Sequence, residues 1–124
     1  MNLLAIGVQI LLGLFFTPEG VIKWTHIGPS TARFTHFRYP QWFRYVTGVV
    51  EVLVGMGLLV GLWFSGIAAL AAVVLVVEML IAIYSHLVRG KDAFVPDVVP
   101  AAVFLLLALL VVAIRWGNLI ALAR

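Results

Sequence analysis

Two glutamates inside apolar stretches constrain this chain more than any other feature. Glu51 lies in TGVVEVLVGMGLLVGL and Glu78 in AAVVLVVEMLIAIY, and both stretches are long enough to enter a bilayer. A carboxyl group at the centre of a membrane is penalised by about 2.5–3.5 kcal/mol on insertion scales, so protonation, a cationic partner or water must relieve it. The fold must therefore hide these two side chains from lipid.

The rest of the sequence is typical of a membrane protein. Of its 124 residues, 65% are hydrophobic and 10% are charged, whereas a soluble domain has roughly 45–50% and 25%. Its apolar stretches at 3–23, 44–64, 66–87 and 98–116 each have roughly the 20 residues that a helix needs to cross a bilayer. We predict an all-α, polytopic membrane protein, an antiparallel four-transmembrane-helix bundle that forms a single domain over residues 1–124.

Composition excludes several kinds of chemistry. The chain has no cysteine, so it has neither disulfides nor thiolate nucleophiles. Its net charge of only +3 is a weak indication of nucleic-acid binding. His26, His36 and His86 could suggest haem ligation, but there is no attachment motif and two of them lie in a loop. We expect no catalytic residue, no metal ion, no covalently bound cofactor and no nucleic-acid partner.

Residues 24–43 form the one long connection, in which aromatic residues alternate with arginine and histidine. Such residues suit the headgroup region, so we expect an interfacial loop that lies on the membrane or folds back over the mouth of the bundle. The first and third connections carry most of the cations, namely Lys23, Arg33, Arg38, Arg44, Arg89 and Lys91. The positive-inside rule then places both connections in the cytoplasm, and we expect a bacterial cytoplasmic membrane.

Helical periodicity predicts an interior pocket near these connections. Glu51 and Glu78 lie about 12 and 15 Å below the loop-bearing surface, at nearly the same level. At about 100° per residue, Glu51 shares a face with Gly48 and Gly55. Small residues beside a polar one are typical of close helix contacts, so we expect both acids to face inward.

Five residues are candidates for ligand binding or proton handling: Lys23, Glu51, Glu78, His86 and Glu19. Lys23 is the best partner for the acids, and Glu19 precedes it by four residues in the favourable acid-first order. Like charges at short range cannot both persist in a low dielectric, so two adjacent acids could hold a proton or bind a polar head. The alternative is that the acids only hold helices together.

Three segments, in order, resemble those of the DoxX-like family of small four-helix membrane proteins. FFTPEGVIKW resembles its G-x-x-K signature, PQWFRYVTGVVEVLVGMGLLV its P...G-x-x-E-x-x-x-G segment, and EMLIAIYSHLVRG its M-x-x-A-x-x-x-H stretch. The resemblance falls on Gly20, Lys23, Pro40, Gly48, Glu51, Gly55, Met79, Ala82 and His86. Glu78 is not part of the pattern, so its role depends on the physical argument alone.

The resemblance implies a four-helix bundle that, in some members, accompanies membrane redox chemistry or oxidative-stress resistance. We therefore expect a lipophilic small molecule such as a quinone in the polar pocket, and a partner oxidoreductase, because the chain has no electron carrier of its own. One alternative is a small proton-coupled exporter. Another is an assembly or scaffold factor that self-associates or holds a partner through exposed faces such as that of Gly57 and Gly61, although these two glycines fit ordinary helix packing equally well. We leave a homo-oligomer open.

Overall fold

The computed structural model describes residues 2–25, 29–91 and 98–122, and the regular structure in these ranges is entirely helical. The π-helical segment η1 continues α4 without a break. The elements are α1 (Leu3–Ile22), α2 (Ser30–His36), α3 (Gln41–Val60), α4 (Ser65–Tyr84), η1 (Ser85–Arg89), α5 (Val99–Ile114) and α6 (Trp116–Leu122).

Among the described residues, three helical segments are long and apolar enough to cross a membrane: α1, α3, and α4 together with η1. Helix α5 is equally apolar but has only 16 residues, or about 24 Å, against roughly 30 Å of hydrocarbon. The predicted span 44–64 is observed as Gln41–Val60, because Pro40 sets an extended backbone just before the helix. The predicted span 98–116 is divided, because α5 ends at Ile114 and the short α6 follows.

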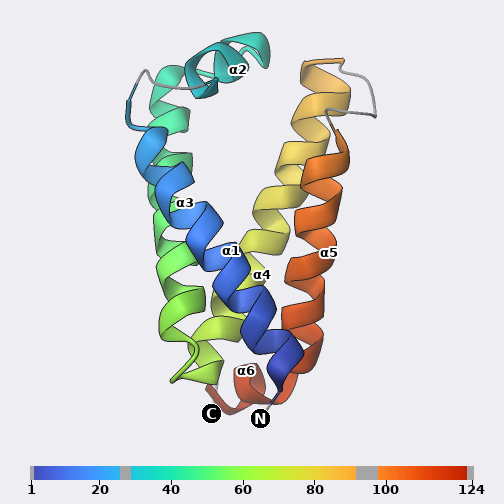
Figure 1. Cartoon of the computed structure of the whole chain (residues 1–124). Coiled ribbons are helices and arrows are strands. Elements are labelled where there is room, and N and C mark those ends of the chain that lie inside the picture. The colour runs from blue at the N-terminus through green and yellow to red at the C-terminus, as the bar shows by residue number, and fades with distance from the viewer. Residues whose placement is uncertain (1, 26–28, 92–97, 123–124) are drawn as a thin grey trace.

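The long helices form two pairs that diverge (Figure 1). Helix α1 packs along α3, and α4 packs along α5. The pairs meet at the end of the molecule where both termini and α6 lie, and they separate toward the end where α2 lies. This arrangement places α2 beside the open end of the wedge.

Glycines hold α1 and α3 close together. A Cβ atom at Gly20 would lie 2.4 Å from the Gly48 carbonyl oxygen, and one at Gly55 would lie 2.7 Å from the Thr17 nitrogen. Real Cβ atoms do not approach this closely, so the two backbones can meet only where side chains are absent. The glycines of the G-x-x-K and G-x-x-E-x-x-x-G segments therefore form one continuous contact.

Gly57 and Gly61 have a different role from the one considered in the scaffold hypothesis. A Cβ atom at Gly61 would lie 2.4 Å from the Cβ atom of Ala68, and one at Gly57 would lie 3.0 Å from that of Ala71. Both glycines pack α3 against α4 within the chain. The interpretation of this face as an exposed contact surface is therefore wrong, and the short turn after α3 explains why the two helices touch here.

A buried glutamine closes the narrow end of the wedge. Gln9 is fully buried and donates a hydrogen bond of 3.1 Å to the carbonyl oxygen of Leu58 in α3. Its own Oε1 atom accepts a hydrogen bond of 3.1 Å from Nε of Arg115, which follows α5. The Gln9 side chain thus links α1 to α3 and to the residue that follows α5. Its donor group and its acceptor group are both hydrogen-bonded.

Candidate functional site

A cavity of about 710 Å³ occupies the wide end of the wedge. Helices α1, α3, α4 and α5 form its walls, and α2 with the segment that follows it contributes the side toward the loops. The volume lies within the roughly 300–1,000 Å³ of small-molecule sites. The sequence predicts a pocket open toward the first and third connections; this cavity has the segment around α2, in the first connection, at its opening, and Lys23, Glu51, Glu78, His86 and Glu19 all line it, whereas residues 92–97 of the third connection lie outside the described residues.

The cavity is layered along the helix axes. Its deepest part is apolar and aromatic, and Phe15, Phe16 and Phe104 pack together there with ring centroids 4.7–5.1 Å apart. One turn further along α1 comes a polar layer that holds Glu19 and Lys23. The layer nearest the loops is again aromatic, with one cation; it contains Arg33, Phe34, Phe37, Tyr39, Phe43 and His86.

Lys23 and Glu51 form a buried ion pair between α1 and α3. The Lys23 Nζ atom lies 2.7 Å from Oε2 of Glu51 and donates a hydrogen bond of 3.1 Å to Oε1. Lys23 is 5% exposed and Glu51 is 4% exposed. Gly48 lies against the Lys23 side chain, so the close helix contact brings the lysine within reach of the acid one turn further along α3.

Glu19 completes an ion-paired trio. Its Oε2 atom lies 3.6 Å from Lys23 Nζ, in the i, i+4 arrangement that the sequence predicts. About a third of its side chain is exposed, so this second contact is weaker than the buried one. The lysine is therefore held mainly by Glu51 and partly by Glu19.

Glu78 approaches this trio from the opposite wall. The carboxyl groups of Glu78 and Glu51 are near enough to interact electrostatically. The Oε2 atom of Glu78 is buried and has no hydrogen-bond partner among the residues that the structure describes. The ion pairs found there involve Glu19 and Glu51 with Lys23, and none involves Glu78. The cavity thus carries one carboxyl group that lacks a cation.

His86 lies apart from the acids, nearer the loops. It belongs to the π-helical turn, where the Gly90 nitrogen donates to the Ser85 carbonyl oxygen at 2.8 Å. Its ring packs edge-on against Phe37 with centroids 4.9 Å apart. Eight residues separate Glu78 from His86, which is about 12 Å along a helix. A direct proton relay between them is too long, and it would need water or a ligand in the cavity.

The segment around α2 is docked on the opposite helix pair. The hydroxyl groups of Tyr39 and Ser85 are hydrogen-bonded at 2.7 Å, and the Ser85 hydroxyl also bonds the Ile81 carbonyl oxygen. Arg89 donates to the carbonyl oxygens of Phe37 at 2.7 Å and Arg38 at 2.9 Å, and its guanidinium lies over the Tyr39 ring. The described part of the predicted loop, residues 29–43, therefore packs against η1 at the open end of the wedge, and its placement on a membrane surface stays a prediction.

Two arginines, Arg44 and Arg89, which from the sequence contribute only positive charge near the loops, hydrogen-bond backbone carbonyl oxygens of other segments. Arg44 is 1% exposed and donates to the carbonyl oxygens of Lys23 and Thr25, where α1 ends. It thereby satisfies carbonyl groups that a helix terminus leaves without partners, as Arg89 does after α2. A signal was present, because Arg44 lies on the same helical face as Gly48 and Glu51.

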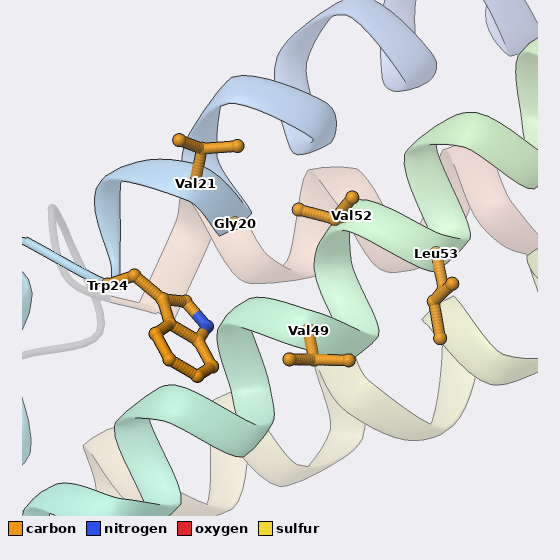
Figure 2. Close-up of a pocket in the computed structure, with 6 residues that line it drawn as sticks. All are labelled: Gly20, Val21, Trp24, Val49, Val52 and Leu53. Carbon is orange, nitrogen blue, oxygen red and sulfur yellow. The ribbon is translucent and has the colours of Figure 1, made fainter.

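A second hollow, of about 260 Å³, lies on the outer side of the α1–α3 contact (Figure 2). Trp24, Val49, Val52 and Leu53 surround it, and Gly20 leaves space because it has no side chain. The Trp24 indole donates to the Tyr45 carbonyl oxygen at 3.0 Å, which uses its only polar group. This groove offers apolar surface alone, and the candidate site is the large cavity.

Together these features define the class: an α-helical integral membrane protein with a charged cluster buried between its helices. The chain belongs to the DoxX-like family, which matches over residues 7–111. This confirms the resemblance drawn from the three sequence segments. The chain is also similar to the uncharacterized protein YdgD of Bacillus subtilis (strain 168), with 29% identity over 93 residues that cover 75% of this chain and 82% of the relative. No solved structure matches it.

Proposed function

We propose that this DoxX-like protein binds a quinone-like or other lipophilic small molecule in the large cavity and acts as an accessory subunit in membrane redox or oxidative-stress processes. The observation that carries the proposal is the layering of the cavity. An apolar floor, a charged layer and an aromatic layer follow one another along the bilayer normal. An amphiphile matches this order when its tail lies against Phe16 and Phe104 and its polar head lies beside Lys23 and Glu51.

The same proposal includes the membrane topology. Helix α5 would be the fourth span, which gives an antiparallel four-helix bundle with the α2 side in the cytoplasm of a bacterial cell. The absence of cysteine allows a direct test. Ala32→Cys in α2 and Asn118→Cys in α6 are both at exposed positions. In intact cells, a membrane-impermeant maleimide should label Asn118→Cys and not Ala32→Cys, and the reverse pattern would invert the orientation.

Electron transfer requires a partner in this proposal. The polar side chains that line the cavity carry carboxyl, ammonium, guanidinium, imidazole and hydroxyl groups, which can bind a head group, and several of them can exchange protons. The electron carrier would come from the ligand or from a partner oxidoreductase. The protein's contribution is then to hold the ligand at a fixed depth and orientation beside that enzyme.

The first test is native mass spectrometry of protein extracted gently from its own membrane. Wild type should retain an amphiphile that is absent from Glu51→Gln, because the amide breaks the ion pair that orients Lys23. Met56→Leu is the matched control, since it lies on the same helix but is exposed and outside the cavity. An amphiphile retained equally by all three proteins, or by none, contradicts the proposal, and the same spectra give the oligomer mass.

One observation favours a second function, that of a proton-coupled exporter. Glu19 of α1 and Glu51 of α3 both contact Lys23, so acids that can exchange protons come from two helices and meet in one charged cluster. Proteoliposomes separate the two functions. Flux of a lipophilic substrate that follows an imposed pH gradient supports the exporter, whereas tight binding without flux supports the accessory subunit.

A further inference from the structure

In the charged layer of the cavity, the described residues provide more hydrogen-bond acceptors than donors. Lys23 is the only cation among the described residues of this layer, and its ammonium group is taken up by Glu51 at 2.7 and 3.1 Å and by Glu19 at 3.6 Å. Glu78 adds a third carboxyl group, which supplies at most one proton as a donor. The layer therefore has more acceptors than the described residues can satisfy.

The acceptor that lacks a donor belongs to Glu78. Its Oε2 atom is buried, lines the cavity wall beside Glu51 and has no hydrogen-bond partner among the described residues. Even when two neighbouring carboxyl groups share a proton, they keep oxygen lone pairs that only accept, so Oε2 of Glu78 still needs a donor from elsewhere. A buried acceptor without a donor is unfavourable, which makes this position one that a ligand can improve.

We propose that Glu78 is a specificity-determining residue that selects ligands whose polar head donates a hydrogen bond, a hydroxyl or an ammonium group, over heads that only accept. This inference rests on the proposed function, because it requires that an amphiphile occupies the cavity. The donor lies between Glu78 and Glu51, and the remainder of the ligand lies toward Phe104. A hydroxyl group and an ammonium group both donate a hydrogen bond to a carboxyl oxygen, so both kinds of head are included.

The aromatic surroundings fit such a head. Phe16 and Phe43 face the cavity on either side of the charged layer, and both have an apolar surface that suits a ring or an alkyl tail. They offer no donor that could reach Glu78. A ligand with an acceptor-only head would therefore leave the Glu78 oxygen as it is, while a donating head would satisfy it with a hydrogen bond.

The experiment uses redox-inert probes of nearly equal shape. Decylresorcinol donates two hydroxyl groups, its dimethyl ether donates none, and decylammonium supplies a cationic donor. Binding is measured to the full chain in lipid nanodiscs, and each variant is compared with wild type so that partitioning into lipid cancels. Wild type should bind decylresorcinol about 10- to 100-fold more tightly than the ether, the range expected for satisfying one buried acceptor that otherwise lacks a donor.

Two variants separate the causes. In Glu78→Gln the new amide donates to Glu51 itself, so the ratio between resorcinol and ether should fall to about threefold or less. Glu78→Asp keeps the carboxyl group and should keep a preference for the donor, which guards against a loss caused by misfolding. Ala82→Phe fills the cavity with a ring and should weaken all probes alike, since Ala82 lines the wall next to the charged layer.

The outcomes distinguish this inference from the function beneath it. Equal binding of resorcinol and ether by wild type, or a preference that survives in Glu78→Gln, overturns the role of Glu78 while leaving the binding site intact. If no probe binds, or if Ala82→Phe does not weaken binding, the proposed function is overturned and this inference with it. Decylammonium binding more tightly than decylresorcinol, with the same dependence on Glu78, supports the inference and identifies a cation as the donor.

Discussion

The ammonium group of Lys23 contacts both carboxyl oxygens of Glu51, at 2.7 and 3.1 Å, across a helix contact made by Gly20 and Gly48. The charged pair and the glycines depend on one another. Without the close backbone approach the lysine would not reach the acid, and without the lysine the acid would be unpaired inside the helix pair. The family-like segments G-x-x-K and G-x-x-E-x-x-x-G encode both halves of this relationship.

Removing the lysine should destabilise the protein strongly. Lys23→Met leaves Glu51 buried without its cation, and losing one partner of a buried pair costs about 3–5 kcal/mol. The double variant Lys23→Met, Glu51→Gln should recover a substantial part of that loss, because the unpaired charge is gone. Unfolding in mixed micelles, followed by circular dichroism, measures both values. Equal stability of the single and double variants would contradict the pairing.

Replacing glycine by alanine should have different effects on stability on the two faces of α1. At Gly20 an added Cβ atom would meet the backbone of α3 at 2.4–2.7 Å, so Gly20→Ala should cost about 1–3 kcal/mol by forcing the helices apart. Gly7 is in the same helix with open space around it, so Gly7→Ala should be neutral or stabilise by up to about 1 kcal/mol. The same unfolding assay compares them, and Gly20→Ala should also weaken retention of any ligand held beside Lys23.

The direction in which polar side chains face could be predicted from the sequence. A period of 3.6 residues places Glu51 with Gly48 and Gly55, and the structure buries all three against α1. The membrane class and the family were likewise predictable, because hydropathy and short segments are local properties. The ligand, the partner and the roles of the five site residues stay predictions.

What could not be predicted depends on contacts between residues far apart in the chain. The sequence does not state that α2 is a helix docked by Arg89, or that Arg44 satisfies carbonyl groups at the end of α1. It also gives no sign that Glu78 lacks a cation, since that follows from where Lys23 is directed. Each of these needs the relative positions of three elements, which local periodicity does not determine.

Loosening the α2 segment should affect local opening more than global stability. Tyr39→Phe removes the hydroxyl group that bonds Ser85 at 2.7 Å, a loss of about 0.5–1.5 kcal/mol. Hydrogen exchange should become faster at the backbone amides of α2 and at Tyr39 itself, and stay unchanged in α3. Tyr84→Phe serves as the control, because Tyr84 directly precedes Ser85 in the chain but its side chain is exposed. Faster exchange in both variants would indicate a general loss of packing.

The narrow end of the wedge offers a test that is independent of the cavity. Gln9→Leu has nearly the same size but leaves the Leu58 carbonyl oxygen and the Arg115 guanidinium without their partner, which should cost about 1–3 kcal/mol. A double-mutant cycle with Arg115→Leu should give a coupling energy of about 0.5–3 kcal/mol, because the two side chains are in direct contact. Asn118→Leu, at an exposed position in α6, is the control for adding an apolar residue at this end. Since Gln9 lies outside the cavity lining, the native mass spectra should still show ligand retention in this less stable variant. If the variant loses the ligand as well as the hydrogen bonds, the contact at the narrow end determines the shape of the site, because it fixes how far the helix pairs diverge.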